Sequence, residues 1–342
     1  MEWSCVPRIF SSHFIAKMRK RCLHCTYSSY CRQHASFKLV NKNSLKPSMW
    51  LNQHIHTSYR PLDLPWWLCV KSIFHWNNET INVWSHLLGF VYLCFMQYWC
   101  YTHFLPEIKA VSSDYLVMAS SMFCSQICMI LSSSYHIFGC QSSTKRRKWL
   151  RADLFGISTG LLGIYLSGIY TSFYHFPEVQ RLYITTLVGI MAISVSIPLY
   201  ASKKSEKRLG VVHLVYIALA LFGLLPTWHW VQLHGGFSHP HVMQWLPSLV
   251  ILFSLVGLAF VFYATLLPER LYPGRFDIVG CSHQWWHLII LAAMVYWHKT
   301  GILLLTHYHT SDQYMNGDAR LGLGESELLF GTKAMGNSTT AF

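Results

Sequence analysis

The sequence predicts an all-α membrane protein, a bundle of seven transmembrane helices with a cytosolic N-terminus and a luminal or extracellular C-terminus. Its 342 residues are 52% hydrophobic and only 12% charged, which is unlike the composition of soluble proteins. Seven apolar runs are long enough to cross the hydrocarbon core of a bilayer. Lys and Arg residues are concentrated on one side of these runs, and this bias sets the predicted orientation.

Each apolar run is interpreted as one membrane-spanning helix, because about 20 apolar residues at a rise of about 1.5 Å each cover the bilayer core. The seven runs are residues 83–104, 115–138, 154–174, 182–200, 211–231, 245–267 and 282–305. The connections are short, and the basic segments KRRK and KKSEKR precede the third and fifth runs. The seventh run begins at SHQWWH, directly after a polar connection.

The positions of these runs divide the chain into three parts. Residues 1–75 are predicted to be a basic N-terminal tail and residues 76–305 the seven-helix domain. Residues 306–342 are predicted to be a flexible C-terminal tail, because their Gly-rich MNGDARLGLGESE segment favours disorder.

The distribution of basic residues orients the bundle. The side that holds the N-terminus has 22 Lys and Arg residues and the opposite side has 4, with Lys299 inside the last run. The positive-inside rule therefore places the N-terminus in the cytosol. The formal net charge of +13 comes from loops and tails between apolar runs, so we expect no nucleic-acid partner.

Three histidines are predicted to meet in the cytosolic half of the membrane. His283 and His287 lie in the first two turns of the last helix, and residues four apart share a helix face. His136 ends the second helix at the same depth. Three imidazoles with one open position are the ligand set of a catalytic zinc, so we predict a Zn²⁺ site. In the alternative interpretation they are packing residues, since a chain with 20 histidines has chance pairs at this spacing.

Two more polar residues at this depth are predicted to be catalytic. Ser132 precedes His136 by four residues and shares its face, and Asp153 opens the third helix. A charge within a membrane segment costs about 2.5–3.5 kcal/mol, so Asp153 is expected to have a partner or a function. A carboxylate beside zinc can hold and deprotonate a water or orient a ligand.

Two other groups of polar residues have structural interpretations. Glu79, Asn82 and His86 form a helical stripe, which either supports the metal site or caps and anchors the first helix. Four histidines on the opposite side of the membrane are interpreted as a solvated loop rather than a second metal site; they are His229, His234, His239 and His241.

Several segments resemble the signature motifs of the progestin and adipoQ receptor family, in the same order along the chain. These segments are NNETINVWSHLLGF (residues 77–90), SSSYH (132–136), the segment around Asp153 and SHQWWH (282–287). The resemblance covers about residues 60–305. LCVKSIF, PTWHWVQLHGG and LPERLYPG are most similar to the family's third member.

The resemblance implies that His136, His283 and His287 bind zinc, that Asp153 holds a water near the ion, and that Ser132 belongs to the same site. It also implies two alternative functions. In the first, which we favour, a receptor-like regulator of signalling at the Golgi or plasma membrane tethers a Raf-type cytosolic kinase through its N-terminal tail and binds a lipid or steroid-like ligand from the membrane. In the second, a zinc-dependent hydrolase cleaves a lipid amide such as ceramide.

Overall fold

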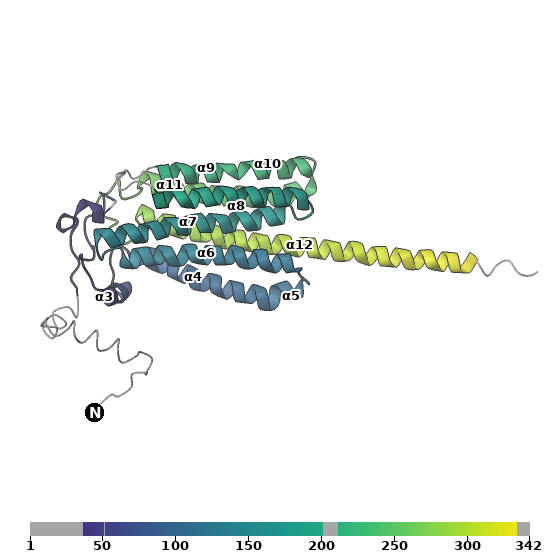
Figure 1. Ribbon diagram of the computed structural model, residues 1–342, viewed down its shortest axis with the longest axis horizontal. Coiled ribbons are helices and arrows are strands. Elements are labelled where there is room, and N and C mark those ends of the chain that lie inside the picture. The colour runs from purple at the N-terminus through teal and green to yellow at the C-terminus, as the bar shows by residue number, and fades with distance from the viewer. Residues whose placement is uncertain (1–36, 51, 201–210, 334–342) are drawn as a thin grey trace, which may run out of the picture.

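The protein is a bundle of long helices whose axes run roughly side by side (Figure 1). The computed structural model describes residues 37–50, 52–200 and 211–333. The long helices of this part of the chain are α4 (Thr80–Trp99), α6 (Ser112–Phe138), α7 (Ser143–Ser172), α8 (Pro177–Tyr200), α9 (Val211–Phe222), α10 (Leu224–Leu233), α11 (Pro240–Thr265) and α12 (Ser282–Lys333). A π-helical turn (Cys100–Phe104) joins α4 to the short α5 (Leu105–Glu107).

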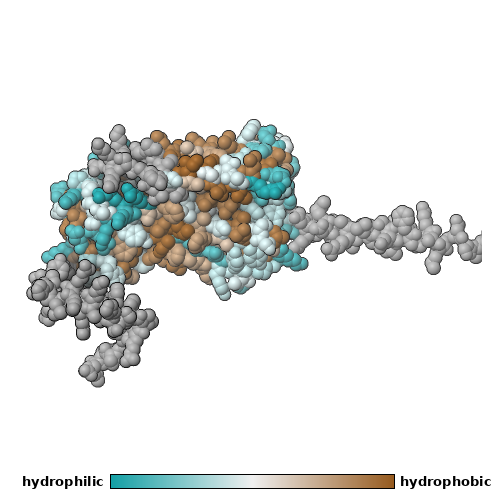
Figure 2. All heavy atoms as spheres, in the orientation of Figure 1, coloured by the Kyte–Doolittle hydropathy of each residue, from teal (hydrophilic) through white to brown (hydrophobic). Residues whose placement is uncertain are grey.

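Each of the seven predicted runs falls on helix, and the all-α prediction is confirmed. Within the described residues, five segments are long and apolar enough to cross a membrane: Ser112–Phe138, Ser143–Ser172, Leu214–Leu233, Pro240–Thr265 and Ser282–Thr310. The two remaining runs lie on α4 and α8, which pack in the same bundle (Figure 1). Figure 2 shows hydrophobic side chains gathered over the middle of the bundle and hydrophilic ones at its two ends, as expected for a protein that faces lipid.

The fifth predicted helix is divided in two. α9 ends at Phe222 and α10 begins at Leu224, with Gly223 between them. Pro226 has no backbone N–H to donate to the carbonyl four residues earlier. The Tyr165 hydroxyl of α7 donates to the carbonyl of Leu219 near the same break.

α12 continues well beyond residue 305, where the last span was expected to end. No proline interrupts the chain between Ser282 and Lys333, and the helix projects past the other helices at the end opposite α3 (Trp66–Lys71) (Figure 1). The end of an apolar run therefore marks the expected limit of the membrane segment, but not the end of the helix.

Part of the expected N-terminal tail is packed against the bundle. Residues 37–75, which we call the N-terminal cap, contain α3, three short 3₁₀ turns and an isolated bridge between Val40 and Tyr59. The Asp277 carboxylate accepts hydrogen bonds from the backbone N–H groups of His56 and Thr57 at 3.0 and 2.8 Å. The periodicity of the sequence gave no sign of this packing, because the cap has little regular secondary structure.

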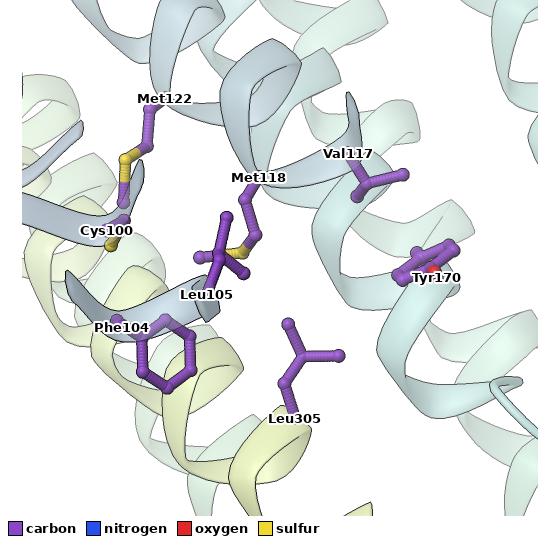
Figure 3. Close-up of a cluster of buried hydrophobic side chains, with 8 residues drawn as sticks. All are labelled: Cys100, Phe104, Leu105, Val117, Met118, Met122, Tyr170 and Leu305. Atoms are coloured by element: carbon purple, nitrogen blue, oxygen red, sulfur yellow. The ribbon is translucent and has the colours of Figure 1, made fainter. Parts of the chain in front are cut away.

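The core at the end of the bundle opposite the cap is apolar and rich in methionine. Met118 and Met122 of α6, Leu105 of α5 and Leu305 of α12 are buried together, and the ring of Tyr170 from α7 closes the cluster (Figure 3). Flexible methionine side chains fill irregular gaps between helices. The cluster joins α12 to α6 and α7, and so fixes how the last helix sits in the bundle.

Candidate metal centre

Three histidines from two helices converge at the end of the bundle that carries the N-terminal cap. One ring nitrogen from each of His136, His283 and His287 lies within 4.8 Å of the others. His136 is in the last turn of α6, and the other two are in the first two turns of α12. His136 and His287 are buried, whereas His283 is half-buried. The spacing of four residues predicted that His283 and His287 share one helix face. His136 is close to them because the end of α6 lies beside the start of α12.

One pair of donor atoms has the spacing expected at a tetrahedral ion. The Nε2 atoms of His136 and His283 are 3.4 Å apart. Two nitrogens bound at about 2.0–2.1 Å to a tetrahedral zinc are separated by about 3.4 Å. Imidazole is also a preferred ligand of borderline divalent ions. The residues present therefore fit a metal ion held by these three side chains.

Glu79 sets the orientation of the His136 ring. The Nδ1–H of His136 donates a hydrogen bond to Oε2 of Glu79 at 2.7 Å. With its proton on Nδ1, the ring keeps the lone pair of Nε2 directed at the other two histidines. Asn82 Nδ2 donates to the same Glu79 oxygen at 2.7 Å. Of the two roles considered for the Glu79 stripe, these contacts favour support of the metal site.

His287 is held by residues of α4. The hydroxyl of Ser85 lies 3.4 Å from its Nδ1. The ring of His86 stacks on the His287 ring with 3.8 Å between centroids and 21° between planes. His86 is buried, and within the described part of the chain neither of its ring nitrogens has a hydrogen-bond partner. The position of His86 in the helical stripe pointed towards the site, but its contact with His287 depends on the packing of α4 against α12.

Asp153 and Ser132 lie next to the triad rather than within the group of three donor nitrogens. The Ser132 hydroxyl is a hydrogen-bond partner of the Asp153 carboxylate, and His136 is also near this carboxylate. Ser132 is buried on α6 and Asp153 is half-buried on α7. The catalytic role of Asp153 and Ser132 stays a prediction, based on a carboxylate near a metal-binding histidine.

Arg60 of the N-terminal cap supports the end of α6. Its guanidinium donates to the carbonyl oxygens of His136 and Ile137, the latter at 2.8 Å, and to the Ser72 hydroxyl at 2.9 Å. These carbonyls belong to the last turn of the helix, which has no donors of its own for them. Nothing in the sequence pattern identified Arg60, because its two carbonyl partners at the end of α6 are more than 70 residues away in the chain.

The chain is similar to known membrane proteins over most of its length. Residues 74–298 match the family described as haemolysin-III related. Progestin and adipoQ receptor family member 3 of Mus musculus is 33% identical over 274 residues, which cover 80% of this chain and 88% of the relative. The adiponectin receptor protein of Drosophila melanogaster is 32% identical over 279 residues, covering 80% of this chain and 61% of the relative. Heptahelical transmembrane protein 1 of Arabidopsis thaliana is 31% identical over 246 residues, covering 68% and 71% of the two chains.

Proposed function

The chain belongs to the haemolysin-III-related family that includes the progestin and adipoQ receptors, as its motifs predicted, and on this basis we propose that it is a receptor-like membrane protein that regulates signalling and holds zinc within the membrane. The observation that carries the proposal is the convergence of His136, His283 and His287, whose ring nitrogens lie within 4.8 Å of one another. Zinc is the ion that three neutral imidazoles and one open position suit best.

Metal analysis of the purified full-length protein tests the zinc assignment. We expect about one zinc per chain in the wild type and a background level in the His283→Ala/His287→Ala variant, because one remaining imidazole does not chelate an ion. His75→Ala is the matched control, since His75 is an exposed histidine near the same end of the bundle. Wild-type protein without zinc, or a double variant that keeps it, would refute the site.

The signalling role is proposed to include tethering of a Raf-type kinase at the Golgi. Support comes from the similarity to family member 3 and from the basic character of the N-terminal region, whose residues 1–36 lie outside the described residues. Deleting residues 1–36 leaves the N-terminal cap in place and should release the kinase from the membrane without changing membrane insertion. Unchanged co-localisation of the kinase after this deletion would exclude that segment as the tether.

We propose that the protein responds to a lipid or steroid-like ligand. Support comes from an apolar cavity between α7, α10, α11 and α12. Its walls include Leu161, Ile164, Phe253 and Trp297. Apolar walls with few polar groups suit a ligand that partitions from the bilayer. Replacing Gly168, on the cavity wall, by Leu should reduce binding of a photoreactive lipid probe to the purified protein.

A second candidate function, hydrolysis of a lipid amide such as ceramide, is supported by the position of Asp153 beside Ser132 and His136. Zinc, when bound, supplies a Lewis acid that polarises a carbonyl. In this function Asp153 would accept a proton from the attacking water and return it to the amide nitrogen as the C–N bond breaks, and Ser132 would hold the carboxylate in place. Asp153→Asn should keep most of the zinc and abolish amide cleavage in a ceramide turnover assay. If the wild-type protein binds zinc but releases no sphingoid base, the hydrolase function is refuted and the receptor-like function is the remaining candidate.

A further inference from the structure

We propose that Cys69 and Cys140 are a redox-active pair, which hydrogen peroxide converts into a disulfide bond that fixes the N-terminal cap to the end of α6. Both cysteines are free thiols in the structure, and their sulfur atoms are 3.6 Å apart. This separation is a van der Waals contact, whereas a disulfide bond is about 2.0 Å long. The two sulfurs must therefore come about 1.6 Å closer for the bond to form.

The two cysteines belong to segments that are far apart in the sequence and packed together in the fold. Cys69 is in α3, and Cys140 lies two residues after the end of α6. Both are buried in an apolar cluster that includes Leu68 of α3 and Ile137 of α6. α3 lies at this end of the bundle (Figure 1). The packing therefore brings the thiols together before any oxidant is present.

Hydrogen bonds hold the two cysteine-bearing segments against each other. The Arg60 guanidinium donates to the Ile137 carbonyl oxygen at 2.8 Å and to the Ser72 hydroxyl at 2.9 Å. The Ser72 hydroxyl in turn donates to the carbonyl oxygen of Cys69 at 2.6 Å. Arg60 thus connects the last turn of α6 with the segment that carries Cys69. Reacting groups held in contact in this way react far faster than free ones.

A cavity between the cap and the bundle gives a small oxidant access to Cys140. Its walls include Arg60 of the cap, Cys140 itself and Arg146 of α7. Arg146 is only half-buried, so the cavity lies close to solvent. Cys69 is fully buried and is not among the residues that line this cavity. Cys140 is therefore the thiol that meets peroxide first, and Cys69 is the thiol that resolves the product.

The surroundings of the two sulfurs assign them the same roles. The hydrogen bond from Cys69 lowers the pKa of the Cys140 thiol, burial acts against this, and the Arg60 guanidinium lowers the pKa further. The same hydrogen bond, together with burial, raises the pKa of the Cys69 thiol. Thiolates are the nucleophiles of cysteine chemistry, and reactive cysteines occur in electropositive surroundings. Cys140 is therefore the attacking thiolate.

The reaction balances with hydrogen peroxide as the oxidant. The Cys140 thiolate attacks one peroxide oxygen and the O–O bond breaks, which gives a sulfenic acid and a hydroxide that takes up a proton to form water. The Cys69 sulfur gives up its proton and attacks the Cys140 sulfur, and the S–O bond breaks with release of a second water. Two electrons pass from the sulfurs to the peroxide. Thiol reductants reverse the reaction by disulfide exchange.

Disulfide mapping by mass spectrometry tests this pair on the purified full-length protein, before and after treatment with hydrogen peroxide. In the oxidised wild type we expect two peptides joined through Cys69 and Cys140, and separation of these peptides by dithiothreitol. Cys69→Ser should instead keep a sulfenic acid at Cys140, which dimedone traps, because no resolving thiol remains. Cys94→Ser, which removes a half-buried thiol on α4, is the matched control and should keep the linkage.

Hydrogen exchange of the same samples shows whether the bond fixes the cap. Exchange of residues 61–75 should be slower in the oxidised wild type than in the reduced wild type, and peroxide should not slow it in Cys69→Ser. A wild type that forms no linkage between Cys69 and Cys140 with peroxide overturns the proposal, and this outcome does not depend on the folding of any variant. A linkage that leaves exchange in the cap unchanged also overturns it.

Discussion

Glu79 is the residue on which the geometry of the metal centre depends most directly, although it is not itself in the triad. Its carboxylate accepts hydrogen bonds from His136 Nδ1 and Asn82 Nδ2, both at 2.7 Å. It therefore determines which nitrogen of His136 is free to bind an ion. A charged acceptor also makes the imidazole a stronger donor to a metal.

We predict that Glu79→Ala lowers zinc affinity by about 10- to 100-fold, since loss of a carboxylate behind a metal-bound histidine has effects of this size. Competition with a chelator on the purified protein would measure the change. Glu79→Gln should be milder, because its amide oxygen can still accept from Nδ1. Glu178→Ala, which removes an exposed glutamate on α8, is the control. Wild-type affinity in Glu79→Ala would show that the hydrogen bond has no influence on the site.

The site residues differ in how far the sequence could predict them. His283 and His287 follow from helical spacing alone, and His136 follows from counting helices and comparing depth. Glu79 could be placed near the site but not assigned a role, because its hydrogen bond to His136 depends on the packing of α4 against α6. Arg60 and the stacking of His86 on His287 could not be predicted, since both depend on contacts between segments far apart in the chain.

At the scale of helices, α6 and α7 pack closely because glycine lies between them. A Cβ atom at Gly163 would lie 2.6 Å from the Ser121 carbonyl oxygen, which is too close for any real contact. The Ser121 hydroxyl donates to the Gly163 carbonyl oxygen at 2.7 Å. Small residues that allow close backbone approach, together with hydrogen bonds between helices, are the usual basis of helix packing in membranes. This pair positions His136 on α6 relative to Asp153 on α7.

We predict that Gly163→Val destabilises the protein by about 1–3 kcal/mol, the usual cost of overpacking a close contact. The change should appear as a lower thermal midpoint in detergent. Gly257→Val is a matched control, because a Cβ at Gly257 on α11 meets no atom within 4 Å. Equal midpoints for the two variants would mean that α6 and α7 can separate at no cost.

The N-terminal cap is an element held mainly by polar contacts. Asp277 is buried and accepts three hydrogen bonds from the cap, two from backbone N–H groups and one from the Thr57 hydroxyl at 2.7 Å. Further along the same connection, the Gly274 N–H donates to the His54 carbonyl oxygen at 2.9 Å. These bonds join the cap to the connection between α11 and α12, immediately before His283.

We predict that Asp277→Ala frees residues 52–60 from the bundle, because hydrogen bonds to a charged group contribute about 1.5–3 kcal/mol each. Hydrogen exchange of this segment should become faster, while exchange in α6 and α7 stays slow. Asp63→Ala is the control, since Asp63 belongs to the cap but its backbone N–H, not its side chain, donates to the Gln141 carbonyl oxygen. Unchanged exchange at residues 52–60 in Asp277→Ala would show that other contacts hold the cap.

At the scale of the whole molecule, the order of the long apolar segments could be predicted because a bilayer requires such segments. Two features could not be predicted from hydropathy. The break at Gly223 has apolar residues on both sides, so the hydropathy of the run does not mark it. The cap of residues 37–75 is polar and irregular in sequence, so its packing at the end of the bundle became clear only from its hydrogen bonds to Asp277 and to the end of α6.

The structure places the cap and the extended end of α12 at opposite ends of the bundle, as an odd number of spans requires (Figure 1). The end that faces the cytosol is predicted from the basic residues, because 22 Lys and Arg lie on the side of the N-terminus and 4 on the other side. We therefore predict that the cap, the metal centre and the N-terminal region face the cytosol, and that His234 and His241 face the lumen or the outside.

Protease accessibility and glycosylation in sealed microsomes test this orientation. A tag at the N-terminus should be digested by added protease, and a tag at the C-terminus should be protected. The sequon at Asn78 belongs to the segment that contacts the cap, where the Asn78 N–H donates to the Ser58 carbonyl oxygen, and it should remain unmodified. The sequon at Asn337, which lies outside the described residues, should be the one that can receive a glycan. Asn78→Gln and Asn337→Gln separate the two sites. A protected N-terminal tag, or a glycan that disappears in Asn78→Gln, would reverse the orientation and expose the metal centre to the lumen instead of the cytosol.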